Sequence, residues 1–475
     1  MNQDSTYTIK TNHLIKFIVF SVIGVFLFMA LLPDGSGSFN IPLGFIINWL
    51  GLTLNAIQVG AFGFLFFLAL VVINISLIGT ILAYAVKPAI IMDNEKMKDA
   101  FLCHPVYFVS KVLAVIIVWM VFLDIGPDWL IGQWLGGWMM MDLIAGGGSG
   151  SNLMSIFIVL GITIPILTDF GIMEFLGILI RKAVRFLFTL PGRSSIDLLG
   201  SWFSSSAASV IITRNQHEKG YYTGREAATI CVNFTLVSLP FTFVVASTVG
   251  LQPYFILFYL IICITSIVLA AIMPRIWPLR GLPDEYLPEV GKQIEEDVPE
   301  DKYMFKWATE LASKRASETG AADVIKSGLT NWLNIFMDLI PVILAWGTVA
   351  LILEAQTPIF DWLSTPFRFM LELLNVQEAA TYSAATVAGF VDMFIPAILL
   401  SGEDAYGNFI APKETRFILG ALSIVQIIYM AETGILILKS KMPLHIGHLI
   451  ILFIMRTVLA IPAIVIMTRI FFNFV

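Results

Sequence analysis

A run of hydroxyl side chains interrupts one of the most apolar parts of the chain. The segment GSWFSSSAASVIITR, residues 200–214, contains Ser204, Ser205, Ser206 and Ser209 between apolar neighbours. Hydroxyl oxygens at membrane depth can coordinate an ion or bind a polar solute, whereas small side chains also let helices pack closely. We expect Ser204, Ser205 and Ser206 to bind a substrate and Ser209 to help bind a cation. Close helix packing is the alternative.

A second polar group follows in CVNFTLVSLPFTF. Asn233, Thr235 and Ser238 precede Pro240 near the middle of an apolar run. Proline removes a helix hydrogen bond and frees a carbonyl oxygen. Freed carbonyls together with side-chain oxygens are suited to a sodium ion in a discontinuous membrane helix. We therefore predict that Asn233, Thr235 and Ser238 bind a cation.

The segment VQIIYMAETGIL, in the second half of the chain, also places polar residues inside an apolar run. It places Gln426, Tyr429, Glu432 and Thr433 just before Gly434, again near the middle of an apolar run. Half-helix ends at such a break suit a charged or polar solute. We predict that these four polar residues bind the substrate.

Ionisable residues inside apolar segments are costly and mark functional sites. Glu432 and Asp392 are the acidic candidates, and Arg456 lies within a later apolar run and is the expected partner of either. Asp392 is predicted to bind the substrate; its alternative role is a helix N-cap at a break in the chain. The alternative for Glu432 is a structural ion pair with Arg456.

Other kinds of chemistry lack their motifs. The sequence has no HExxH zinc motif and no GK[ST] phosphate loop, and its three cysteines form no CxxC pair. We therefore expect neither an enzyme nor a resident metal or cofactor, and no nucleic-acid partner. The only ion expected is a coupling ion, sodium or a proton.

The composition is that of a membrane protein. Hydrophobic residues make up 58% of the chain and charged residues 13%, against about 25% charged residues in soluble domains. We predict an all-α polytopic membrane protein with about nine spans, plus an apolar piece over 42–58 that lies in the interface or beside the second span. The predicted spans are 14–32, 60–86, 106–124, 152–180, 226–250, 254–274, 329–354, 416–438 and 446–469.

The placement of Lys and Arg predicts a cytoplasmic N-terminus. Positive charges occur in the N-terminal tail, in the connection 87–111, which ends at Lys111, and in 181–225, whereas the connection 125–151 has none. The serine run has positive charge on both sides. We infer that 194–213 is a re-entrant hairpin that enters and leaves on the cytoplasmic side, since such a hairpin can break only where it is buried or lines a cavity.

The second half of the chain repeats the first. Three motif pairs keep their order: IPILTDFG and IPVILAWG, RFLFTL and RFMLEL, IMPRI and IMTRI. Three spans per half would invert the second half, and inverted repeats with broken helices are typical of secondary transporters. The predicted units are residues 1–150, a three-helix membrane region; 151–274, a first repeat with hairpin 194–213; 275–328, a cytoplasmic polar loop; and 329–475, an inverted second repeat with hairpin 379–402.

The polar loop 275–328 carries eight Lys or Arg and eleven Asp or Glu. We expect a solvated connector between the two halves. A regulatory or docking arm is the alternative.

The chain resembles a known family in these segments. SSSAASVIITRNQHEKGYYTGREAA, VSLPFTFV, ATVAGFVDMFIPAIL and QIIYMAETGIL are similar to the YjiH-like membrane proteins that carry the nucleoside-recognition, or Gate, domain. The layout is more distantly similar to concentrative nucleoside transporters, although the first hairpin lacks their Gln-Thr-Glu group. That likeness implies cation coupling, an elevator movement, hairpin tips at Ser204–Ser206 and Asp392, and unwound helices at Asn233, Ser238 and Glu432.

We therefore predict a cation-coupled secondary transporter of a small polar organic solute in a bacterial inner membrane. The resemblance suggests a nucleoside or nucleobase. An amino acid or small peptide is an alternative, because Glu432, Asp392 and Arg456 could hold a zwitterion, and a scaffold or signalling protein is another. By analogy, the first three spans could build a homo-oligomer.

Overall fold

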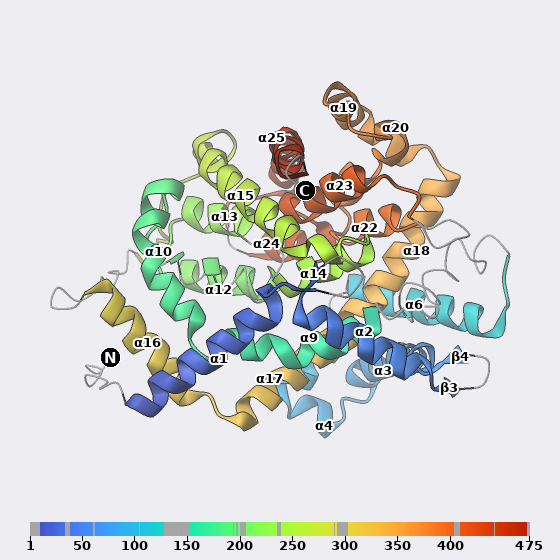
Figure 1. Cartoon of the computed structure of the whole chain (residues 1–475), viewed down its shortest axis with the longest axis horizontal. Coiled ribbons are helices and arrows are strands. Elements are labelled where there is room, and N and C mark those ends of the chain that lie inside the picture. The colour runs from blue at the N-terminus through green and yellow to red at the C-terminus, as the bar shows by residue number, and fades with distance from the viewer. Residues whose placement is uncertain are drawn as a thin grey trace.

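The computed structural model describes residues 10–33, 39–59, 62–103, 105–127, 144, 153–192, 194–195, 198–199, 206–234, 239–288, 290–291, 303–402, 409–440 and 442–472. Within these ranges the chain is almost entirely helical (Figure 1). The described strands form two small antiparallel hairpins, β1 (Leu32–Pro33) with β2 (Phe39–Asn40) and β3 (Gln58–Val59) with β4 (Phe62–Gly63). The predicted all-α fold is confirmed.

The N-terminal region contains two long apolar helices and several shorter ones. Its helices are α1 (Thr11–Met29), α2 (Pro42–Asn55), α3 (Phe64–Ala85), α4 (Ala89–Met92), α5 (Glu95–Phe101) and α6 (Pro105–Leu123). The apolar piece predicted over 42–58 is α2, which packs against α1, α3 and the later helix α9 (Leu153–Thr168).

The next part of the chain begins with a bent pair of helices. These are α9 and α10 (Ile172–Phe188), which meet at an angle of 58°. The helices that follow are α12 (Ser206–Glu218), α13 (Gly224–Asn233), α14 (Leu239–Thr248) and α15 (Phe255–Ile272), with short 3₁₀ turns at η2 (Gln252–Tyr254), η3 (Met273–Arg275) and η4 (Leu279–Gly281).

The last part repeats this order after α16 (Met304–Glu318). Its elements are α17 (Ala321–Asn334), the π-helix η5 (Ile335–Leu339), α18 (Ile340–Gln356), α19 (Ile359–Leu373), α20 (Ala379–Tyr382), α21 (Ala385–Ala388), α22 (Ile395–Leu400), α23 (Lys413–Gln426), the π-helix η6 (Met430–Gly434), α24 (Ile435–Lys439) and α25 (Ile446–Phe472). In both halves an apolar helix with a proline (α9, α18) is followed by an amphipathic helix (α10, α19), then by shorter helices, and last by a long apolar helix (α15, α25).

The amphipathic helices show how sequence sets this order. In α10 the buried side chains include Ile178, Val184 and Phe188, and in α19 they include Phe360 and Phe367. Spacings of three and four residues place one apolar stripe on each helix. The repeated order of elements was predicted from the motif pairs; the domain boundaries stay a prediction.

Fewer described helices are long enough to cross a membrane than the nine predicted spans. Five qualify by length and composition, or six if the α9–α10 pair is one span. The difference has a physical cause, because the predicted spans 226–250 and 416–438 are each broken into shorter helices. Helix α6, which covers the predicted span 106–124, is not among the five, because its apolar part is the shorter stretch Tyr107–Leu123. The chain is a multi-pass membrane protein.

The polar loop is not a solvated connector throughout. Helix α16 packs against α1 and α10, with Ala308, Ala312 and Ala316 fully buried. The Oγ1 atom of Thr319 donates a 2.7 Å hydrogen bond to the carbonyl oxygen of Asp169, at the bend between α9 and α10. Small side chains let α16 approach closely, so this part of the loop is built into the fold.

Lys111, which ends the positively charged connection 87–111 of the sequence analysis, has a fully buried side chain in α6. Its Nζ atom lies 2.9 Å from Oδ1 of Asp338 in η5 and donates hydrogen bonds to Oγ1 of Thr80 and to the carbonyl oxygen of Ala100, both at 3.1 Å. Partners from three segments supply the paired environment that a buried charge needs.

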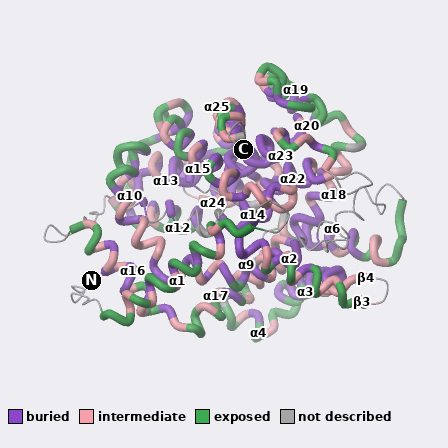
Figure 2. Tube along the Cα trace, viewed as in Figure 1, coloured by how far each residue is buried: buried purple, intermediate pink, exposed green. Residues whose placement is uncertain are grey.

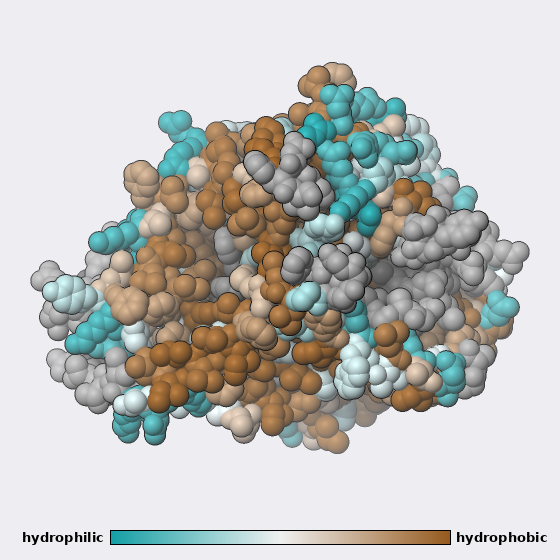
Figure 3. Space-filling view, in the orientation of Figure 1, coloured by the Kyte–Doolittle hydropathy of each residue, from teal (hydrophilic) through white to brown (hydrophobic). Residues whose placement is uncertain are grey.

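Burial follows the arrangement expected for a protein in lipid. Buried residues gather around α9, α14, α22 and α23, and exposed residues lie toward the periphery (Figure 2). Apolar side chains cover much of the face seen in Figure 3. Helix α1 contributes exposed Ile15, Ile18, Val22 and Phe26. These side chains face the bilayer, which replaces water as their solvent.

Candidate functional site

Helices α13 and α23 both end next to the long helix α25. α13 ends at Asn233 and α23 ends at Gln426, where Ile427 adopts a φ of 63° and stops the helix. A β-branched residue at positive φ is uncommon and strained. Helix α23 packs against α25. Each end leaves carbonyl oxygens without a partner in its own helix.

Arg456 of α25 binds both helix ends. Its guanidinium is fully buried, and its Nε and Nη2 atoms donate to the carbonyl oxygen of Val425 at 3.1 and 2.8 Å. Its Nη1 atom donates to the carbonyl oxygen of Val232 at 3.1 Å and to Oδ1 of Asn233 at 2.7 Å. We expected Glu432 or Asp392 as the partner of Arg456. In the described part of the chain, the hydrogen-bond partners are backbone carbonyls and an amide.

Gln426 connects the second break to the second hairpin. Its Nε2 atom donates to the carbonyl oxygen of Thr386 at 2.7 Å and to Oγ1 of Thr457 at 2.8 Å. The carbonyl acceptor fixes which end of the amide carries the nitrogen. Among the residues that the structure describes, the Oε1 atom is then buried without a hydrogen-bond partner, and so is Oγ1 of Thr433 in η6. Buried polar groups without partners are uncommon and call for an explanation.

Asp392 lies where the second hairpin breaks, between α21 and α22. Its side chain is 7% exposed, and its Oδ1 atom accepts a 2.8 Å hydrogen bond from the backbone N–H of Phe394. The N-cap of α22 is Phe394, without a side-chain cap hydrogen bond, so Asp392 forms an Asx turn before the helix and not the N-cap given as its alternative role. The second carboxylate oxygen is left for another partner.

The hairpin break and the helix break are held together by backbone hydrogen bonds. The N–H of Met430 donates to the carbonyl of Phe390 at 2.8 Å, and the N–H of Ala431 donates to the carbonyl of Val391 at 3.0 Å. Gly389 lies beside the Gln426 amide, because a Cβ atom there would overlap Oε1 of Gln426. The site is thus a junction of two irregular segments that satisfy each other's backbone groups.

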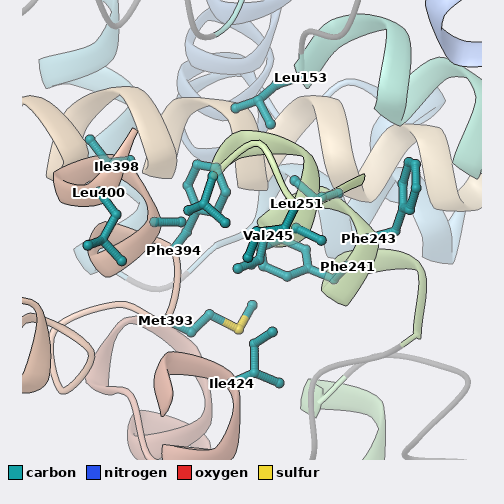
Figure 4. Close-up of a cluster of buried hydrophobic side chains, with 14 of the residues drawn as sticks. Leu153, Phe241, Phe243, Val245, Leu251, Met393, Phe394, Ile398, Leu400 and Ile424 are labelled. Carbon is teal, nitrogen blue, oxygen red and sulfur yellow. The ribbon is translucent and has the colours of Figure 1, made fainter. Parts of the chain in front are cut away.

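Elements of each half also pack against elements of the other half. Helix α12, in the first hairpin region, packs against η6 and α24 of the second broken helix, and α22 of the second hairpin packs against α14 of the first broken helix (Figure 1). Phe241 of α14 and Phe394 meet with ring centroids 5.9 Å apart. Figure 4 shows them together with Met393 and Ile424 in the core. The described elements α12, α14, α22, η6 and α24 therefore bring the two halves into contact.

The predicted site residues divide into two groups. Asn233, Asp392, Gln426, Tyr429, Thr433 and Ser209 are described and buried. Ser204, Ser205, Thr235 and Ser238 lie outside the described residues, as do the side chains of Ser206, at the start of α12, and Glu432, in η6. The structure brings Asn233 and Gln426 to Arg456 and α25, and brings Asp392 close to η6. Their roles in binding stay predictions.

Sequence reasoning missed three residues of this region. Thr386 and Thr457 fix the Gln426 amide, and Gly389 makes room for it. Gly389 had a detectable signal, since a glycine beside a predicted hairpin break suggests close approach of another group. Thr386 and Thr457 had none, because threonine bonded within its own helix is common in apolar segments.

The region presents hydrogen-bond acceptors. Within the described residues, no three His, Cys, Asp or Glu side chains converge on one point. The groups that remain available are an amide oxygen, a hydroxyl and a carboxylate oxygen, and these accept hydrogen bonds from solute N–H and O–H groups.

Comparisons with known proteins give one family match and one close relative. The model of the Gate family, described as nucleoside recognition, matches residues 151–252, which lie in the first of the two predicted repeats. An uncharacterized protein of Alkalihalophilus pseudofirmus, BpOF4_10220, is 39% identical over 467 residues, covering 98% of this chain and 96% of the relative.

Two solved structures of CNTnw are similar to the chain. A CNTnw variant in an outward-facing state has a TM-score of 0.36 and 15% identity, covering 90% of this chain and 97% of CNTnw. CNTnw in an inward-facing substrate-bound state has a TM-score of 0.37 and 14% identity, covering 95% and 94%. TM-scores this low do not establish a shared fold.

Proposed function

Because the chain belongs to a family of multi-pass membrane proteins with a nucleoside-recognition (Gate) domain, together with BpOF4_10220 of Alkalihalophilus pseudofirmus, we propose that it is a secondary transporter of a nucleoside or nucleobase. The observation that carries the proposal is a pair of buried oxygens, on Gln426 and Thr433 beside the break at Asp392, that have no hydrogen-bond partner among the described residues. Such oxygens are costly unless a ligand pairs with them.

The chemistry of these groups supports a nucleoside. A carboxylate beside a site pairs well with ribose hydroxyls, as it does in dinucleotide-binding proteins. An amide oxygen and a threonine hydroxyl can accept from the N–H groups of a base. We assign Asp392 to the sugar, and Gln426 and Thr433 to the base. Tyr429, Glu432 and Ser204–Ser206 are proposed to complete the substrate site.

The position of Arg456 argues against the amino acid alternative. A zwitterion needs a positive group for its carboxylate, and Arg456 was the candidate. Its side chain is fully buried and its hydrogen bonds go to the helix ends. The packing of α16 argues against a free scaffold arm, because that part of the loop is built into the fold.

Coupling to sodium or a proton is part of the proposal. Discontinuous helices with freed carbonyl groups are the elements at which transporters bind coupling ions. Thr235, Ser238 and Ser209 are the proposed ligands on the side of the first break. We also propose a bacterial inner-membrane location with a cytoplasmic N-terminus, from the distribution of Lys and Arg.

The test is a thermal-shift screen of the purified protein in detergent. Uridine, adenosine, uracil, adenine, leucine and dialanine are each added in sodium and in potassium buffers, at pH 6 and pH 8. A ligand at about 100 times its Kd stabilises the folded state by about 2.7 kcal/mol. We expect a rise in Tm with a nucleoside or base, larger in sodium or at low pH. A rise with leucine or dialanine alone, or none at all, would contradict the assignment.

A matched pair of variants locates the site. Asp392→Asn is expected to remove most of the nucleoside-induced shift, because it removes the charge that binds the ribose hydroxyls. Asp361→Asn, on the exposed side of α19, is expected to keep it. An equal response of both variants would remove Asp392 from the site.

A further inference from the structure

The ends of α13 and α23 present three oxygen atoms to one point inside the protein. These are the carbonyl oxygens of Val232 and Val425 and the Oδ1 atom of Asn233, and all three accept hydrogen bonds from Arg456. Carbonyl and amide oxygens that converge at helix breaks are the usual ligands of a small cation. Here the cation is a side chain of the protein itself.

The charges at this point balance without an acidic residue. The C-terminal end of a helix carries roughly half a negative charge. Two such ends, of α13 and α23, therefore offset about one positive charge, which is that of a single guanidinium. In the part of the chain that the structure describes, the four hydrogen bonds of Arg456 go to these ends and to an amide. The helix ends act as the counter-ion.

The shape of the guanidinium suits two partners at once. Nε and Nη2 bind Val425 on one side and Nη1 binds Val232 and Asn233 on the other. A planar fork with five donors can bridge two helices in this way, whereas the single ammonium of lysine cannot match its geometry. The next residue, Thr457, also contacts α23 through Gln426.

We propose that the ends of α13 and α23 form a cation-binding site and that Arg456 occupies it permanently, as a cation built into the chain. The site would take a guanidinium-type organic cation if Arg456 were removed. The broken helices of the two halves are thereby joined through one charge. The Asn233 amide then serves this internal cation rather than a soluble sodium ion, which leaves any coupling ion to other ligands.

A series of variants at Arg456 tests the charge. Arg456→Lys keeps the charge but loses the fork, and Arg456→Met keeps a similar length without charge. We expect the wild type to have the highest Tm, Arg456→Lys a lower Tm and Arg456→Met the lowest, with differences of several degrees. An apolar replacement of a buried charge is often neutral or stabilising when the charge has no structural purpose. A Met variant as stable as the Lys variant would overturn the proposal.

The matched control lies on the same helix. Arg469 of α25 pairs with Glu414 and its side chain is 40% exposed, so Arg469→Met changes the same residue type outside the junction. We expect a much smaller change in Tm for this variant. A loss of Tm equal to that of Arg456→Met would mean that the junction has no special role.

Chemical rescue tests the site directly. Arg456→Ala opens the junction, and its Tm is measured against guanidinium chloride in the low millimolar range, at an ionic strength held constant with choline chloride. We expect a saturable rise in Tm for Arg456→Ala and none for the wild type or Arg469→Met. No rise, or the same rise in the wild type, would overturn the proposal. If Arg456→Ala does not fold, the Lys and Met series decides.

Neither set of Tm measurements uses the transported solute. The measurements therefore test the cation-binding site independently of the proposed transport function.

Discussion

The Nη1 atom of Arg456 lies 2.7 Å from Oδ1 of Asn233, although the two residues are 223 positions apart in the chain. The contact joins the end of α13 in the first half to α25, the last helix. The same guanidinium holds the end of α23. The geometry of both breaks thus depends on one side chain. A substitution at Arg456 should therefore alter the ends of both α13 and α23.

Replacing Thr433 by valine should separate stability from binding. The Thr433 hydroxyl is buried and has no hydrogen-bond partner in the part of the chain that the structure describes, so Thr433→Val should leave the unfolding free energy unchanged or raise it by about 1 kcal/mol. Solute binding should weaken roughly three- to tenfold, the value of one hydrogen bond. Thermal shift without and with solute measures both effects.

Thr457→Val is the matched control for this change. The Thr457 hydroxyl accepts from Gln426 and donates to the carbonyl of Phe453, so its loss should destabilise the solute-free protein by about 1–2 kcal/mol. If Thr433→Val is the more destabilising of the two, its hydroxyl has a partner within the protein.

A methyl group at Gly389 should displace the Gln426 amide. A Cβ atom at this position would overlap Oε1 of Gln426, which two hydrogen bonds from Nε2 hold in place. We expect Gly389→Ala to lower stability by about 1–2 kcal/mol and to reduce the nucleoside-induced thermal shift. Gly402→Ala is the control, because the nearest atom to its Cβ would be 4.0 Å away. Equal behaviour of the two variants would mean that Gln426 moves without cost.

The ion pair of buried Lys111 and partly exposed Asp338 should behave as a coupled unit. Lys111→Met leaves Asp338 without its partner inside the protein and should cost about 3 kcal/mol of stability. Adding Asp338→Leu removes the uncompensated charge and should recover most of that loss. A double-mutant cycle measured by thermal or denaturant unfolding gives the coupling energy. Additive losses would show that the two charges do not stabilise each other.

Gly171 tests the docking of α16 on the bend. Its φ of 99° strains any residue with a Cβ atom, and that Cβ would overlap the backbone of Ala312. Gly291 also has positive φ, 67°, but has nothing within 4 Å of the added atom. Gly291→Ala should therefore show only the backbone cost, about 1 kcal/mol, and Gly171→Ala should cost more and expose α16 to protease. Equal losses would mean that α16 adjusts freely.

The fold class and the approximate positions of the helix breaks could be predicted from the sequence. Apolar runs, prolines and repeated motifs predicted the order of elements around Asn233 and Gln426, because these signals act over a few residues. The contacts of Arg456 could not be predicted in this way. Its partner Val232 is 224 positions away, and the expectation that a buried arginine pairs with a carboxylate overlooked helix ends as acceptors. The second break depends on Ile427 at positive φ, which residue preferences argue against.

The crossed packing of the two halves has a consequence for how the protein is made. Chains emerge from the ribosome from the N-terminus, and α12 is inserted long before η6 and α24, against which it packs. Helix α12 therefore lacks these neighbours until η6 and α24 have been synthesised. The buried arginine that joins the two breaks lies on α25, the last helix to arrive. Assembly of this region must be a late event in biogenesis, and a chain truncated before α25 would leave both helix ends open.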